Sequence, residues 1–369
     1  AASDVYKRQD MCNGSIMDKL ISFSLPLMLS GILQLMFNAV DIIVVGRFSG
    51  KQALAAVGST TALINVFTNL FIGISLGANV LAARFFAAGR KEEMSETVHT
   101  SITLALISGI LMAFVGLVFS KGALELMGTP EDVIGLSTLY MRIYFMGMPF
   151  FMLYNYGAAI LRAVGDTKRP LYFLIIAGVI NAGLNMVLVI VFGLGVAGVG
   201  IATVFSQMVS CVLVLTCLCR TEGSYKLSFS KLSMKGYYLK QIFQVGIPAG
   251  IQSTVINFSN VLLQSSVNSF GSIAMAGYTA SNNIFGFLYV SVNSFTQACM
   301  SFTSQNYGVK KLKRMDRVLI DCMILSVVVT LILGSSVYIF GPELLHIYSN
   351  QADVIKYGME LSLIHISEP

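Results

Sequence analysis

The sequence predicts an all-α membrane protein that crosses the bilayer many times. Of its 369 residues, 55% are hydrophobic and only 11% are charged, and the mean hydropathy is +0.76. In soluble globular proteins roughly a quarter of the residues are charged, so this chain has too few charges to cover a surface exposed to water. Its apolar residues also gather in long runs, each about the length that a helix needs to cross a bilayer.

Nine apolar runs are long enough to span the hydrocarbon core as helices, and a tenth run begins near residue 354. Three of these runs contain a proline, namely Pro26, Pro149 and Pro248, so we expect tilted or bent helices. The expected spans are residues 18–46, 53–83, 98–120, 138–161, 170–192, 195–219, 240–269, 274–305 and 318–341.

Basic residues are concentrated in alternate loops. Four segments, at 84–93, 161–170, 219–240 and 308–317, hold 16 of the 24 Lys and Arg residues. Because positively charged loops stay on the cytoplasmic side, we expect these loops and the N-terminus to lie in the cytoplasm. The expected location is the plasma membrane of a bacterium, with the lipid bilayer as a partner. Short basic loops beside spans do not indicate binding of nucleic acid.

The chain also repeats itself, which predicts its organisation. Pro26, Asn38 and Phe48 recur 222 residues later as Pro248, Asn260 and Phe270. One copy contains six spans, an even number, so both copies begin on the same side of the membrane. Parallel repeats of this kind occur in alternating-access transporters.

We therefore expect a six-helix bundle at residues 10–225 and an incomplete second bundle, of three to four helices, at 226–361. The second copy stops where the first begins its fourth span, so the repeat predicts that about three helices are absent. Residues 1–9 and 362–369 resemble translated adapter sequence, and we expect these two ends to be non-native.

One carboxylate lies in the middle of the first apolar run, within QLMFNAVDIIVVGR. A charged side chain at the bilayer centre costs about 2.5–3.5 kcal/mol on insertion scales, so it normally faces protein or water and has a function. Gln34, Asn38 and Asp41 are spaced by four and three residues, which sets them on one helix face. We expect this face to look into the bundle.

A structural role for Asp41 is the alternative, because this carboxylate could pair with Arg47 or cap a kinked turn. The repeat argues against that alternative, since the corresponding position in the second copy is Leu263. From Gln241 to Val309 the second copy contains no Asp, Glu, Lys, Arg or His. Across these two spans the second copy therefore has no acidic or basic side chain that can exchange a proton inside the membrane, whereas the first bundle has Asp41.

Four segments resemble the multidrug and toxic compound extrusion (MATE) family of transporters. They are FNAVDIIVVGRFSG (37–50), AAILRAVGDTKRPLYF (158–173), GLGVAGVGIATVFSQ (193–207) and GIPAGIQ (246–252). The resemblance implies two parallel six-helix bundles in the full-length family. It also implies export of small, often cationic and amphipathic compounds, driven by an inward flow of protons or sodium ions.

The resemblance further implies a cation site in the first bundle, where an aspartate on the first helix meets polar groups on the fifth and sixth. The matching positions are Asp41, Asn181, Asn185 and Thr203. The family pattern on the fifth helix is often NxxxD, whereas this chain reads NAGLN. A site with one negative charge binds a cation less firmly, so we favour proton coupling and leave sodium coupling open.

The amide and hydroxyl groups of this set could instead form ordinary hydrogen bonds between helices, which are common in membranes. Other polar residues in the spans are candidates for a substrate cavity, and two of them, Tyr140 and Asn155, match positions that face the central cavity of the family. The full set of cavity candidates is Gln34, Asn38, Asn65, Asn69, Tyr140 and Asn155.

We expect no enzyme activity, no cofactor and no metal centre other than a possible sodium ion at the coupling site. The six cysteines and three histidines have no metal-ligand spacing, and the glycines of GLGVAGVG lack the lysine of a nucleotide-binding loop. The expected protein is a monomeric antiporter for a drug-like substrate.

Two alternatives remain. One is a flippase for lipid-linked oligosaccharides from the same superfamily, which should line its cavity with several basic residues, whereas Arg142 is the only basic residue well inside a span. The other is a membrane protein that transports nothing.

Overall fold

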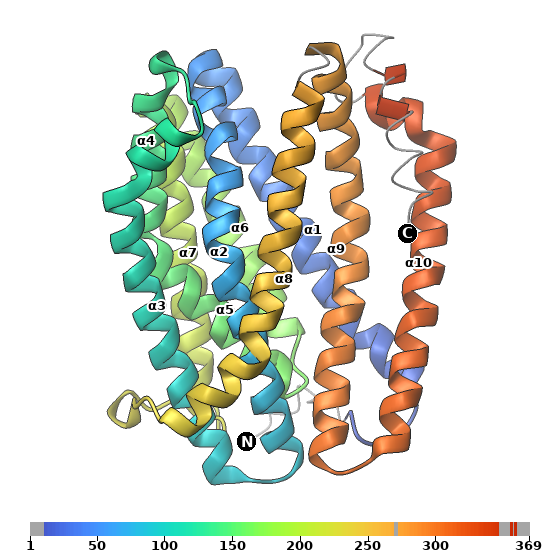
Figure 1. Cartoon of the computed structure of the whole chain (residues 1–369). Coiled ribbons are helices and arrows are strands. Elements are labelled where there is room, and N and C mark those ends of the chain that lie inside the picture. The colour runs from blue at the N-terminus through green and yellow to red at the C-terminus, as the bar shows by residue number, and fades with distance from the viewer. Residues whose placement is uncertain (1–10, 269–271, 347–354, 357, 360–369) are drawn as a thin grey trace.

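The structure is a computed structural model that describes residues 11–268, 272–346, 355–356 and 358–359 (Figure 1). The described residues are almost entirely helical and contain no strand. The helices are α1 Ile16–Phe48, α2 Gly50–Ala87, α3 Lys91–Leu126, α4 Glu131–Met146, α5 Met148–Ala163, α6 Lys168–Asn185, η1 Met186–Val191, α7 Gly195–Arg220, η2 Phe229–Lys231, α8 Gly236–Asn268, α9 Ser272–Gly308 and α10 Leu312–His346.

The predicted all-α fold is confirmed, and each of the nine predicted spans corresponds to helical structure. Two spans are less regular than predicted. The span at 138–161 is divided at Gly147 into α4 and α5. Pro149 therefore lies in the first turn of α5, where proline is favoured, and does not interrupt a helix. The span at 170–192 begins as α6 and ends as the π-helical turn η1. The tenth span predicted near 354, and the ends 1–9 and 362–369, lie outside the described residues.

Six segments of the described residues are long and apolar enough to cross a membrane by themselves, which makes the chain a multi-pass membrane protein. They are α1, most of α2, α3, α6 together with η1, α7 and α10. Helices α4 and α5 have 16 residues each, too few to cross singly, but they follow each other directly. Helices α8 and α9 are long enough, but their many Asn, Gln and Ser residues make them less apolar.

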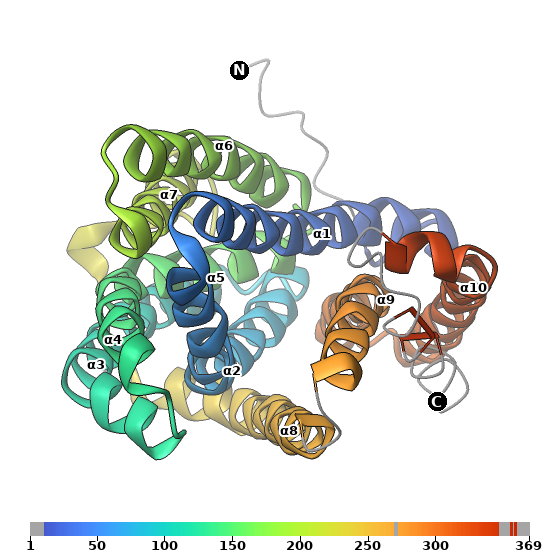
Figure 2. The same cartoon turned by 90° about the horizontal axis from the view of Figure 1, so that it is seen from above.

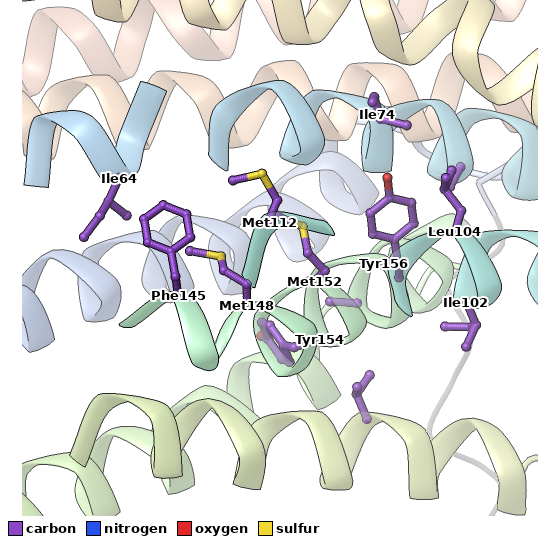
Figure 3. Close-up of a cluster of buried hydrophobic side chains, with 14 of the residues drawn as sticks. Ile64, Ile74, Ile102, Leu104, Met112, Phe145, Met148, Met152, Tyr154 and Tyr156 are labelled. Carbon is purple, nitrogen blue, oxygen red and sulfur yellow. The ribbon is translucent and has the colours of Figure 1, made fainter. Parts of the chain in front are cut away.

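Helices α1 to α7, which we call the first bundle, share the larger apolar core. Buried side chains of α1 to α5 and α7 form one cluster, which Ile242 of α8 also joins, and Phe173 and Leu174 of α6 pack against it. Figure 3 shows part of this cluster, with Met112 of α3 near Met148 and Met152 of α5. In Figures 1 and 2 the second group, α8 to α10, stands beside the first bundle, with α8 along α2.

Helix α1 belongs to both groups. The turns around Leu20 and Phe23 pack against α9 and α10, and the Phe23 and Phe302 rings meet edge to face at 5.5 Å. The second half of α1, around Val44 and Val45, lies in the core of the first bundle. Pro26 lies inside α1, next to the half that contacts α9 and α10. Figure 2 shows α1 running from the first bundle across to α10.

Helices α2 and α8 touch backbone to backbone through glycines. A Cβ atom placed on Gly73 would lie 2.2 Å from the Cα of Gly250, and one on Gly77 would lie 2.2 Å from the carbonyl oxygen of Ile242. A Cβ on Gly246 would lie 2.5 Å from the Cα of Ile74. Small residues at four-residue spacing let membrane helices approach closely, and here they set the distance between the first bundle and α8.

Replacing Gly73 by alanine should lower the stability of the folded protein. The new methyl group would meet the Gly250 backbone, which cannot move without shifting α8, and overpacking of this kind costs roughly 1–3 kcal/mol. Gly58→Ala is the matched control in the same helix, because nothing lies within 4 Å of a Cβ at that position. Thermal melting of purified protein in detergent would measure the difference. Equal melting temperatures for the two variants would contradict the described α2–α8 contact.

Candidate functional site

Asp41 is buried inside the first bundle, with 6% of its surface exposed. Asn185 of α6 donates an N–H from Nδ2 to Oδ1 of Asp41 at 2.5 Å. Thr203 of α7 donates its hydroxyl to Oδ2 at 3.2 Å. A carboxylate away from water needs such donors. The structure therefore brings together three of the predicted residues, each from a different helix.

The fourth predicted residue, Asn181, holds Asn185 in place. Nδ2 of Asn185 also donates to Oδ1 of Asn181 at 3.1 Å, so both N–H groups of the Asn185 amide are used. The Oδ1 atom of Asn185 is buried and has no hydrogen-bond partner among the described residues. A buried acceptor without a partner, next to a carboxylate, fits a water molecule or a positively charged group.

The Thr203 hydroxyl has two possible acceptors. Its Oγ1 lies 3.2 Å from Oδ2 of Asp41 and 3.0 Å from the carbonyl oxygen of Val199, one turn earlier in α7. A hydroxyl has a single hydrogen, so it can donate to only one of them at a time. When Asp41 carries a proton, Thr203 can donate to Val199 and accept from the carboxyl. The site can thus satisfy both forms of Asp41.

Small residues allow α1, α6 and α7 to meet at this level. A Cβ on Gly178 of α6 would overlap the ring of Phe37, which lies one turn before Asp41 in α1. The π-helical turn η1 begins directly after Asn185, and a Cβ on Gly198 of α7 would lie 3.2 Å from the backbone of Leu188 in η1. Single π-helical turns are often found at functional sites.

Two tyrosine side chains and one glutamine side chain extend the polar surroundings of Asp41. Tyr140 of α4, a predicted cavity residue, is buried and close enough to interact electrostatically with the Asp41 carboxylate. Two further residues were not predicted as site residues. Tyr144 lies one turn after Tyr140, with ring centroids 6.1 Å apart. Gln207 lies one turn after Thr203, and its Oε1 is buried without a hydrogen-bond partner in the part of the chain that the structure describes. Their one-turn spacing from predicted residues was the only signal in the sequence.

The alternative pairing of Asp41 with Arg47 does not hold. Arg47 is exposed in the last turn of α1, and the ion pairs found among the described residues do not include it. Asp41 is buried in the first bundle, whereas Gln34 and Asn38, which share its helix face, are exposed. At this level α1 passes from α9, where Gly31 lies against Val290, to the first bundle, where Phe37 lies against Gly178 of α6.

The other cavity candidates lie in different surroundings. Asn65 is exposed and Asn69 is half-buried, and Nδ2 of Asn69 donates to the carbonyl oxygen of Asn65 at 2.6 Å. Asn155 is half-buried and donates to the carbonyl oxygen of Phe151 at 2.8 Å. Of the six candidates, only Tyr140 has a described interaction with Asp41.

Comparison with known proteins defines the class. The MatE family model matches residues 26–187 and 248–367, that is, two segments of the chain. "Probable multidrug resistance protein YoeA" of Bacillus subtilis is 31% identical over 359 residues, which cover 95% of this chain and 77% of that protein. The "FAD transporter" of Shewanella oneidensis is 23% identical over 357 residues, covering 95% of this chain and 78% of that protein.

Solved structures show the same fold. "Crystal structure of MATE in the straight conformation" superimposes with a TM-score of 0.89 at 22% identity, covering 98% of this chain and 81% of that one. A second structure, "Outward-facing conformation of a multidrug resistance MATE family transporter of the MOP superfamily", also has a TM-score of 0.89 at 22% identity. The match covers 96% of this chain and 79% of that one.

The family model and the relatives that match this chain define its class as multi-pass membrane transporters. The chain belongs to the MatE family of multidrug efflux transporters.

Replacing Thr203 by valine should reduce transport, whereas Thr203→Ser should retain it. Valine has nearly the shape of threonine but no hydroxyl, so Oδ2 of Asp41 would lose its donor; serine keeps the donor. The loss of a hydrogen bond to a charged group should lower the rate of dye efflux roughly tenfold. Efflux from cells that express each variant at equal levels would measure it. Equal rates for the valine and serine variants would show that the hydroxyl has no role.

Proposed function

We propose that the protein is a secondary antiporter that exports small amphipathic or cationic compounds in exchange for protons, with Asp41 as the group that carries the proton. The observation that supports the proposal most is the carboxylate of Asp41, buried in the first bundle and held by donors from α6 and α7. A buried ionisable group in a membrane helix is a functional site by default. The family to which the chain belongs supplies the class of activity.

The two forms of Asp41 favour different contacts of α1. The carboxylate accepts hydrogen bonds from Asn185 and Thr203, which draws α1 toward α6 and α7. The neutral carboxyl becomes a donor itself, toward Thr203, and attracts the Asn185 amide less. Because the other half of α1 packs against α9 and α10, a shift of α1 reaches the second group of helices. Such coupling requires only that the two forms prefer different packings by a few kcal/mol.

The same residues bear on the choice between protons and sodium ions. A sodium ion could find oxygens on Asp41, Thr203 and the unpaired Oδ1 of Asn185. This set carries one negative charge, and an amide occupies the position where many family members have a second carboxylate. One carboxylate suffices for a proton and gives only weak attraction for a hydrated cation, so the proposal favours the proton.

The proposal extends to substrate, location and organisation. We propose a plasma-membrane monomer with its N-terminus and basic loops in the cytoplasm, in which residues 10–225 and 226–361 move as two bundles. The names of relatives support a drug-like substrate. One of them is "Multidrug export protein MepA" of Staphylococcus saprophyticus, which is 21% identical over 353 residues.

Asp41→Asn should abolish proton-coupled efflux while leaving the protein folded. The asparagine has the same size but cannot exchange a proton. The matched control is Asp321→Asn, which alters another buried carboxylate, one that pairs with Arg317 at 3.2 Å in α10. Dye efflux and dye-driven proton release from proteoliposomes would both be measured. Undiminished coupled efflux by Asp41→Asn would end the proposal.

Asn185→Asp should make the protein respond to sodium. A second carboxylate next to Asp41 would double the negative charge of the site and attract a metal cation. We expect sodium ions to raise the melting temperature of this variant but not that of the wild type. Asn155→Asp is the control, because the Asn155 amide donates within its own helix, to the carbonyl oxygen of Phe151. An equal sodium response in the wild-type protein would contradict proton coupling.

A further inference from the structure

Three buried polar side chains connect α9 to the first bundle away from Asp41. Ser301 of α9 donates its hydroxyl to Oδ1 of Asn79 in α2 at 3.1 Å. Nδ2 of Asn79 in turn donates to the carbonyl oxygen of Ala159 in α5 at 2.8 Å. Nε2 of Gln305 donates to the carbonyl oxygen of Ala163, the last residue of α5, at 2.6 Å. We call Asn79, Ser301 and Gln305 the cross-bundle cluster.

The cross-bundle cluster lies toward the end of the molecule that carries the basic loops, the lower end in Figure 1. There the ends of α2 and α9 also touch. A Cβ on Gly308 would lie 2.3 Å from the carbonyl oxygen of Arg84, and the Arg84 guanidinium lies 4.8 Å from the centre of the Tyr307 ring. The cluster is thus part of a closed contact between the two groups of helices. Its three side chains are each at most 4% exposed.

Ser301 behaves differently from neighbouring hydroxyl residues of the same helix. Ser291, Thr303 and Ser304 each donate to a carbonyl oxygen one turn earlier in α9, the usual arrangement for serine and threonine in helices. Ser301 instead donates across to Asn79. If α9 moved away, the Ser301 hydroxyl could return to its own helix and Asn79 would keep its bond to Ala159. This contact can therefore break and re-form without leaving a donor buried and unpaired.

Gln305 differs from Ser301, because its side-chain N–H needs either the Ala163 carbonyl or water as an acceptor. Its Oε1 atom accepts from the thiol of Cys12 at 4.0 Å. The carbonyl of Ala163 has no partner within α5, since it ends that helix. Both groups are satisfied when the end is closed and dry, and both can be hydrated when water enters. A buried amide–carbonyl pair at a moving contact thus specifies the closed position without preventing opening.

We propose that Ser301 and Gln305 are positioning residues for transport: their bonds to Asn79 and Ala163 hold α9 closed against α2 and α5 at the basic end, and they are released when the two groups part. The inference takes from the proposed function only that the groups part during transport. It does not depend on Asp41 or on the identity of the ion.

The distance between the two groups tests the proposal directly. Spin labels on cysteines at Lys168 and Lys313, both exposed, would report the separation at the basic end after the six native cysteines are replaced by serine, which keeps a donor for Gln305 at position 12. In the Ser301→Ala, Gln305→Leu double variant, we expect the ratio of parted to closed molecules to rise about 5- to 100-fold, from the loss of two hydrogen bonds. Ser301→Ala alone removes one atom and should shift the ratio about 2- to 10-fold.

Ser304→Ala is the matched control, because the Ser304 hydroxyl donates only within its own helix, to Met300. Its distance distribution should match that of the parent protein. The proposal is overturned if the double and single variants also keep the parent distribution while melting at temperatures close to the parent's. If the Ser301 and Gln305 variants show the expected rise in parted molecules while Asp41→Asn keeps full coupled efflux, the proton-coupling proposal is refuted and this one stands.

Discussion

The solvation of a single carboxylate by protein groups is the constraint on which the arrangement of the first bundle depends. Asp41 is buried, with 6% of its surface exposed, so its two oxygens need donors from the neighbouring helices. Asn185 and Thr203 supply them, which fixes how close α6 and α7 must stand to α1. Gly178 makes the approach of α6 possible by leaving room for the ring of Phe37.

This constraint extends beyond the first bundle because α1 is shared. Half of the helix contributes to the core around Asp41, and the other half packs with Phe302 and its neighbours. In the proposed mechanism, a shift of α1 that follows a change in the protonation state of Asp41 therefore reaches α9. The Thr203 hydroxyl can donate either to Asp41 or to the Val199 carbonyl, and Oδ1 of Asn185 has no hydrogen-bond partner among the described residues. Both features allow the site to accommodate the charged and the neutral form of Asp41.

The sequence predicts the fold well because long apolar runs in a bilayer can only be helices. The break at Gly147 is harder to predict, since Gly147 and Pro149 could equally bend one continuous helix. The π-helical turn after Asn185 has no sequence signal, because residues 186–191 are all apolar and fit an α-helix equally well.

The site was predictable where a charge or a family motif marked it. Asp41 stands out in an apolar run, and Asn181, Asn185 and Thr203 follow from the resemblance. Tyr144 and Gln207 carry no charge and resemble ordinary helix residues. Ser301 and Asn79 are 222 residues apart, and which hydroxyl of α9 reaches another helix depends on the packing of α2 against α9. The exposure of Gln34 and Asn38 likewise depends on the path of α1, which local spacing does not reveal.

The central claim is that Asp41 carries the proton that is exchanged for substrate, so substrate binding should displace this proton. Calorimetric titration of purified protein with a cationic drug, in buffers of different ionisation enthalpy, measures the protons released on binding. The account predicts release of up to about one proton per bound drug in the wild-type protein and none in Asp41→Asn. Equal proton release by both proteins would contradict it.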